Sequence, residues 1–220
     1  MIACAKKIFF LLFISCSSLA QTPQQYFGEK YKTALSFVKT YKNLFVKYLG
    51  KENSPKAIAI IFPEILRYNT LSNEAELQLL KSLYIRFGKK YADFSIGYFQ
   101  MKPSFIETLE NILGKSVMDT PENREKRLLK MMDVEGQILY LKDYWKIMHS
   151  KYPDIHKENN ASQVRFLASA YNYGFLASET KILNWSKEKA FPSGKNSSVR
   201  FSYADIAEDF YLKEIPKIFR

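Results

Sequence analysis

The chain has 220 residues, of which 47% are hydrophobic and 15% aromatic. This composition is enough to bury a core and argues against disorder. Thirty-three lysines and arginines against 22 aspartates and glutamates give a formal net charge of +11. A charge of this sign and size predicts an anionic partner, which is a nucleic acid, an anionic lipid or an anionic polymer.

The first 20 residues have the layout of a secretory signal peptide. Lys6 and Lys7 precede an apolar run from Ile8 to Ile14, which is too short to span a bilayer. Small residues follow, and they predict cleavage after Ala20. In the alternative interpretation, cleavage occurs before Cys16, which then carries a lipid.

Export narrows the choice of partner and of chemistry. We expect the protein in the periplasm or cell envelope, or at the outer membrane if Cys16 is the lipid anchor. Both cysteines of the chain, Cys4 and Cys16, lie in the signal segment, so the mature chain has no thiol for a disulfide or for catalysis unless Cys16 is retained. Export also argues against nucleic acid and favours an envelope polymer such as a cell-wall glycan.

The rest of the chain predicts a mainly α-helical fold with little or no β-sheet. Apolar residues recur at steps of three and four, and Gly, Pro, Ser and Thr punctuate the pattern. Gly50 predicts the end of the first helix, Ser54 and Pro55 predict the start of the next, and Pro63 predicts a break or restart. The polar stretch 192–200 predicts a surface loop. The expected helices cover residues 24–49, 57–62, 73–87, 102–113, 120–149, 160–170 and 203–212.

The sequence offers little support for metal, cofactor or nucleophilic chemistry. His149 and His156 are seven residues apart with no cysteine near, which is not a metal-site spacing. There is no glycine-rich phosphate loop and no G-x-S-x-G motif. We therefore expect no cofactor and no metal, and carboxylate chemistry remains.

Glu64 is the candidate carboxylate. It is the only acid in the apolar block from Ala57 to Leu66. Burial among apolar side chains raises the pKa of a carboxyl group, which can then act as a general acid near neutral pH. In the alternative interpretation, Glu64 is an ordinary glutamate behind Pro63, and Arg67, three residues later, pairs with it and lowers its pKa.

Two further motifs bear on this choice. The segment "SIGYFQMKP", Ser95 to Pro103, resembles the G-x-x-Q-[IVM]-x-P segment of soluble lytic transglycosylases and goose-type lysozymes. The segment "ASAYNYG", Ala168 to Gly174, resembles their "AAYNAG" segment. In that family the catalytic glutamate comes first, the G-x-x-Q turn second and the A-Y-N-x-G helix end third. The same order holds here, with Glu64 first.

The resemblance implies a single lysozyme-like helical domain and assigns roles to residues. Glu64 would be catalytic, and the two motifs would line a glycan cleft. This chain departs from the family where Ile65 replaces the usual serine after the glutamate, and where Tyr173 replaces a small residue. The implied substrate-binding residues are Ser95, Gly97, Gln100, Tyr171, Asn172 and Gly174.

The resemblance also implies a reaction and a domain organisation. A lytic transglycosylase cuts the β-1,4 bond between N-acetylmuramic acid (MurNAc) and N-acetylglucosamine (GlcNAc) with one glutamate and leaves 1,6-anhydro ends. Two alternatives stay open: a lysozyme-type hydrolase with Asp93 as second carboxylate, and a peptidoglycan-binding protein without activity. We expect a monomer whose partner is the glycan strand. The expected segments are a signal peptide at 1–20, a helical extension at 21–55 and a lysozyme-like domain at 56–220.

Overall fold

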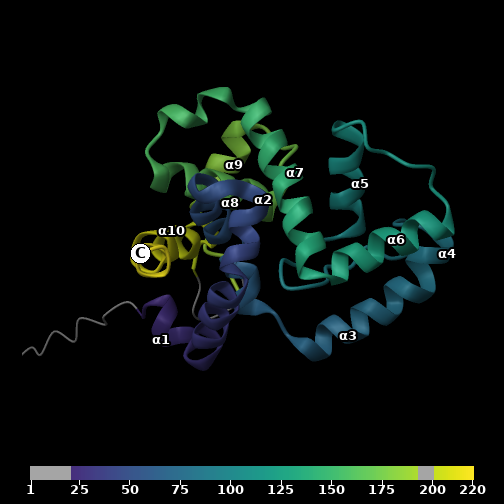
Figure 1. The fold of residues 1–220 in the computed structure, drawn as a ribbon, viewed down its shortest axis with the longest axis horizontal. Coiled ribbons are helices and arrows are strands. Elements are labelled where there is room, and N and C mark those ends of the chain that lie inside the picture. Colours follow the sequence, from purple (N-terminus) through teal and green to yellow (C-terminus); the bar gives the residue numbers. More distant parts are fainter. Residues whose placement is uncertain (1–20, 193–200) are drawn as a thin grey trace, which may run out of the picture.

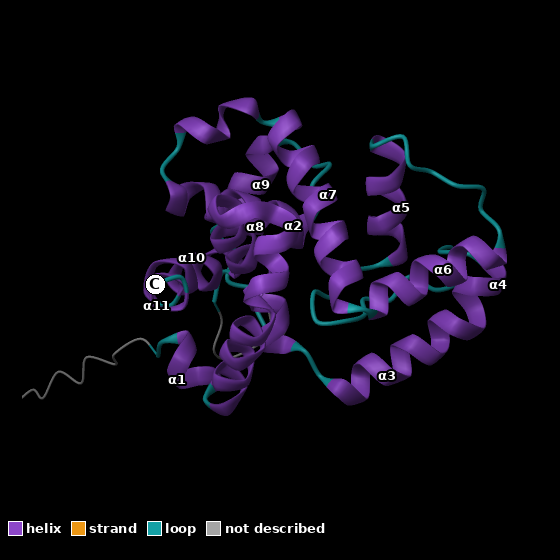
Figure 2. Ribbon diagram, in the orientation of Figure 1, coloured by secondary structure: helices purple, strands orange, loops and turns teal. Residues whose placement is uncertain are grey.

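The computed structural model describes residues 21–192 and 201–220. The expected signal peptide, with Cys16 and Ala20, and all but the first residue of the expected loop at 192–200 lie outside the described residues. Figures 1 and 2 show a helical molecule. The helices are α1 (Pro23–Phe27), α2 (Glu29–Arg67), α3 (Thr70–Leu79), the π-helical turn η1 (Leu80–Tyr84), α4 (Ile85–Phe87), α5 (Pro103–Ile112), α6 (Pro121–Met132), α7 (Val134–Lys151), the 3₁₀ turn η2 (Pro153–Lys157), α8 (Asn160–Tyr173), α9 (Glu179–Trp185), α10 (Tyr203–Lys213) and α11 (Ile215–Ile218).

The prediction of a mainly helical chain is confirmed. Within the described ranges, strand pairing is limited to two isolated antiparallel bridges, between Ile96 and Met101 and between Phe191 and Phe201. The first bridge closes a short hairpin at residues 96–101, which lies between α4 and α5. The helices predicted at 102–113, 160–170 and 203–212 correspond to α5, α8 and α10.

The long helix α2 differs from its prediction at two points. Gly50 leaves the helical conformation with a φ of 79°, and the helix resumes at the next residue rather than at Ser54. The Ser54 hydroxyl donates to the Gly50 carbonyl at 2.6 Å, so it bonds back to the kink across the first turn that follows. Pro63 does not end the helix, which continues to Arg67. The apolar block around Pro63 is buried, and this packing maintains the helix despite the missing N–H.

The expected extension at 21–55 shares its core with the rest of the chain. Val38 and Phe45, in the first half of α2, have no exposed surface and belong to the same hydrophobic cluster as Phe62. In the second half of α2, the ring of Phe62 stacks on that of Phe210 in α10, with 3.7 Å between centroids. Helix α2 therefore packs along its length against α7, α8 and α10.

Two other predicted helices have different boundaries. The helix predicted at 73–87 begins earlier, at Thr70, because the side chain of Asn69 accepts from the Ser72 N–H and caps it. The single helix predicted at 120–149 is wrong: α6 and α7 are separated at Asp133, whose backbone is extended. The Asp133 carboxylate accepts from the Gly136 N–H at 2.9 Å, so this side chain starts a new helix.

The helices form two groups that meet at α7 (Figure 1). Helices α2, α8 and α10 pack on one another, and α9 packs on α8. Helices α3, α4, α5 and α6 lie on the other side, where α5 and α6 contact α7. The hairpin at 96–101 connects α4 to α5 and brings its turn next to the first group.

Candidate active site

A cleft of about 900 Å³ contains most of the residues that the sequence predicted for a site. Its walls come from the end of α2, the hairpin, α5, the end of α8, α9 and the start of α10. Of the predicted residues, Gly97 and Asp93 are not among those that line it. The predicted residues that do line it are Glu64, Ser95, Gln100, Tyr171, Asn172 and Gly174.

Glu64 lies one turn before the end of α2 and is only 3% exposed. Its carboxylate accepts a short hydrogen bond from the guanidinium of Arg67, three residues later on the same helix. Both interpretations of Glu64 therefore apply in part, since it is buried on the cleft wall and is also paired with Arg67. Glu64 lines the same cleft as Gln100 and Tyr171.

Burial controls the pKa of Glu64. The loss of water around the carboxylate raises its pKa. The charge of Arg67 and hydrogen bonds from Arg67, Asn172 and Tyr203 act in the opposite direction, but they offset burial only in part, and the pKa lies above its ordinary value. Glu64 thus has what a general acid needs: a pKa shifted toward neutrality and a position on a cleft.

This raised pKa predicts a dependence of stability on pH. The folded protein keeps a proton on Glu64 at pH values at which the unfolded chain has released it. The free energy of unfolding should therefore decrease as pH rises from 4.5, the ordinary value, through the folded pKa. Glu64→Gln has no such titration. In urea unfolding from pH 4 to 8, the free energy of unfolding of wild type minus that of Glu64→Gln should fall with pH. A difference that stays constant, or rises, contradicts the raised pKa.

The hairpin explains why Gln100 stands between two large apolar residues. Phe99 and Met101 are buried, whereas Gln100 is at the turn with a φ of 50° and lines the cleft. The Gln100 amide nitrogen donates to the Gly97 carbonyl at 2.8 Å, which fixes the side chain across the turn. The turn thus brings Gln100 to the cleft between two buried residues, of which Met101 also forms part of the cleft wall.

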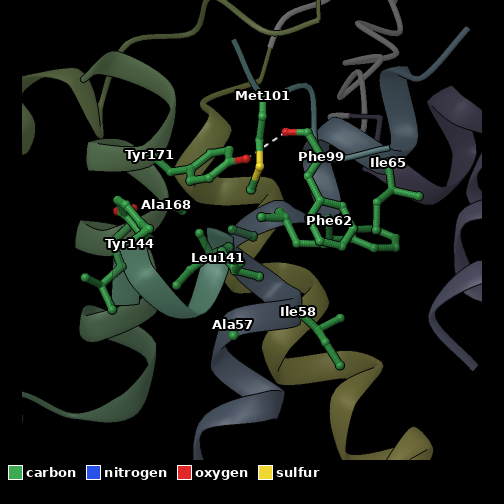
Figure 3. Close-up of a cluster of buried hydrophobic side chains, with 14 of the residues drawn as sticks. Ala57, Ile58, Phe62, Ile65, Phe99, Met101, Leu141, Tyr144, Ala168 and Tyr171 are labelled. Atoms are coloured by element: carbon green, nitrogen blue, oxygen red, sulfur yellow. Dashed lines mark hydrogen bonds between the residues drawn. The ribbon is translucent and has the colours of Figure 1, made fainter. Parts of the chain in front are cut away.

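Three side chains from distant helices hold the hairpin. Asn73 in α3 accepts from the Gly97 N–H at 2.7 Å, and Gln137 in α7 accepts from the Phe99 N–H at 2.8 Å. Tyr171 in α8 donates its hydroxyl to the Phe99 carbonyl at 2.7 Å, as the close-up in Figure 3 shows. Gly97 does not line the cleft. It packs against the Gln137 side chain and so helps to hold the hairpin in place. The hydroxyl of Tyr171 holds the hairpin.

Asp93 has a structural role in this geometry. One carboxylate oxygen accepts from the Ser104 N–H at 2.8 Å and the other accepts from the Ser104 hydroxyl at 2.6 Å. Both contacts are at the first turn of α5, so Asp93 caps that helix. A second carboxylate does line the cleft, but it is Glu188, which follows α9.

Sequence reasoning missed the part of the cleft between α8 and α10. Trp185, Glu188 and Tyr203 line the cleft, and the first two lie in a segment for which no pattern predicted structure. Helix α9 has only seven residues, too few for a periodic apolar pattern. The one available signal was Trp185, a tryptophan in a polar neighbourhood downstream of the A-Y-N segment.

Comparisons with known proteins found no matching family model, no matching curated protein and no matching solved structure. None of the helices within residues 21–192 and 201–220 combines the length and the apolar character that crossing a membrane requires. Those residues also contain no grouping of three or more His, Cys, Asp or Glu side chains suited to a metal ion.

Proposed function

We propose that the protein is an exported lytic transglycosylase of peptidoglycan, with Glu64 as its single acid and base. The observation that carries the proposal is a buried carboxyl group of raised pKa on the wall of an open cleft. Gln100 and Asn172, from the two motifs that resemble the lytic transglycosylase family, line the same cleft. A lysozyme-like fold and a periplasmic or envelope location, with Cys16 as a possible lipid anchor, belong to this proposal.

The reaction needs one proton carrier. Protonated Glu64 donates its proton to the oxygen that bridges MurNAc and GlcNAc, and the bond from that oxygen to C1 of MurNAc breaks. The C6 hydroxyl of the same MurNAc then attacks C1, and its proton returns to the Glu64 carboxylate. The products are a 1,6-anhydro end and a free 4-hydroxyl. No water is consumed, so no second carboxylate takes part.

Arg67 has a defined part in this scheme. Its guanidinium contacts the Glu64 carboxylate and favours the charged form. That form arises only after Glu64 has released its proton, so Arg67 stabilises the step in which charge develops. Burial keeps the starting carboxyl protonated, and Arg67 limits how far the pKa rises.

A lysozyme-type hydrolase is the second candidate function, and Glu188 is the observation that favours it. Hydrolysis normally uses two carboxyl groups on either side of the scissile bond. Asp93, the second acid that the sequence suggested, caps α5 instead, whereas Glu188 lines the cleft with Glu64. In that case Glu188 would activate water or stabilise the intermediate.

Mass spectrometry of muropeptides after digestion of purified peptidoglycan separates the candidates. A transglycosylase leaves anhydro ends, which are one water lighter than the reducing ends that a hydrolase leaves. We expect anhydro ends from the wild type and none from Glu64→Gln. Reducing ends would assign the hydrolase, and co-sedimentation with peptidoglycan without any cleavage would assign a binding protein.

A further inference from the structure

Trp185 is the last residue of α9 and contacts a predicted site residue. Its indole N–H donates to the side-chain oxygen of Asn172 at 2.9 Å, and both residues line the cleft. The Trp185 ring also lies against the ring of Tyr173, with 5.1 Å between centroids and 35° between planes. The indole is thus held by a ring contact with Tyr173 and by a hydrogen bond to Asn172.

The chemistry of this contact determines which way the Asn172 amide points. An indole N–H is only a donor, so it pairs with the amide oxygen and not with the amide nitrogen. The nitrogen, with its two N–H donors, is then directed away from Trp185. Asn172 and Glu64 line the same cleft, and a hydrogen bond from the Asn172 side chain lowers the pKa of the Glu64 carboxyl. Only the amide nitrogen can donate that bond, because a carboxylate is an acceptor. A flipped amide would place two acceptor oxygens against each other and two donors against each other.

We propose that Trp185 is a positioning residue, which fixes the Asn172 amide so that its nitrogen donates to Glu64. The orientation itself depends only on the contacts described above. Its effect on catalysis rests on the proposed function. The Asn172 donor stabilises the Glu64 carboxylate more than the neutral acid, so it acts when Glu64 releases its proton.

Replacing Trp185 by phenylalanine removes the N–H and keeps an aromatic ring beside Tyr173. The Asn172 amide is then free to turn, and Glu64 loses a donor. The pKa of Glu64 should rise further, and the alkaline limb of the pH–rate profile should move to higher pH. Because a hydrogen bond to a charged group is lost, kcat should fall by about 10- to 100-fold.

The experiment measures the Glu64 carboxyl by carbon-detected NMR titration in wild type, Trp185→Phe, Asn172→Ala and the double variant. Trp145→Phe is the matched control, since Trp145 is the other tryptophan of the chain and lies in α7 outside the cleft. We expect Trp185→Phe and Asn172→Ala each to raise the pKa of Glu64, with no further change in the double variant. Trp145→Phe should leave it at the wild-type value.

A Trp185→Phe titration that matches Trp145→Phe would overturn the proposal. A shifted titration in a protein that cleaves no peptidoglycan would support the positioning role and reject the transglycosylase. If Trp185→Phe does not fold, the indole N–H resonance of the wild type provides the test. It should move as Glu64 titrates and lose this response in Asn172→Ala. An indole N–H resonance that does not shift as Glu64 titrates would overturn the proposal as well.

Discussion

Replacing Glu64 by glutamine should reduce peptidoglycan cleavage by about 10²- to 10⁴-fold, the usual contribution of general acid–base catalysis. Glutamine keeps the shape of the side chain and still offers an oxygen to Arg67, but it carries no transferable proton. Folding and binding to the wall should therefore persist. Release of soluble muropeptides measures the cleavage, and co-sedimentation with peptidoglycan measures the binding.

Asp93→Asn and Glu188→Gln are the matched controls, because each also replaces one carboxylate by an amide. A transglycosylase should tolerate both. Asparagine at 93 retains an oxygen for the Ser104 N–H, so the cap on α5 is largely preserved. Loss of activity in Glu188→Gln as well as in Glu64→Gln would indicate a hydrolase with two carboxylates. Full activity in Glu64→Gln would show that the acid lies elsewhere.

Gly97→Ala should lower the free energy of unfolding by about 2–4 kcal/mol. The backbone of Gly97 has a φ of 74°, where an alanine is strained. A Cβ placed there would also lie 2.4 Å from the Gln137 amide nitrogen, so the Gln137 side chain must move. That movement breaks its hydrogen bond to the Phe99 N–H, which is buried. Urea unfolding at neutral pH measures the loss.

Gly114→Ala is the control for Gly97→Ala, because it introduces backbone strain without a steric clash. Gly114 follows α5 with a φ of 66°, and a Cβ there would meet nothing within 4 Å. Its replacement should cost only the backbone strain, about 1 kcal/mol. Equal losses in Gly97→Ala and Gly114→Ala would show that the contact between the hairpin and Gln137 contributes little. The cleft residue Gln100 should also lose order in Gly97→Ala, because the turn that carries it is displaced.

The helical part of the fold was predictable because long amphipathic segments carry their own signal. The apolar stripes of α2, α8 and α10 repeat over several turns, and the periodicity indicates both the element and its buried face. The break at Asp133 was missed although an Asp can cap a helix, because the apolar pattern continues in phase from α6 into α7. The boundary is determined instead by the Asp133 carboxylate, which accepts a hydrogen bond from the Gly136 N–H and so starts α7.

The candidate site was predictable only where one stretch of sequence contains both the residue and its environment. The apolar block predicted the burial of Glu64, and the spacing of three predicted its pairing with Arg67. The role of Asp93 was not predictable, since Ser104 is eleven residues away and the intervening hairpin brings them together. The same holds for Trp185, whose contact with Asn172 depends on how a seven-residue helix returns to the cleft.

The three bonds that hold the hairpin also determine when the cleft can form. They join the hairpin to residues 24, 38 and 72 positions away along the chain. Contacts of such separation form late, because the entropy of closing the intervening chain is lost before the bonds are made. Glu64 lies in the first third of the chain, but the wall around it is complete only when α8 docks. We therefore expect the cleft to be among the last features to form during folding, and a partly folded chain to lack an assembled site.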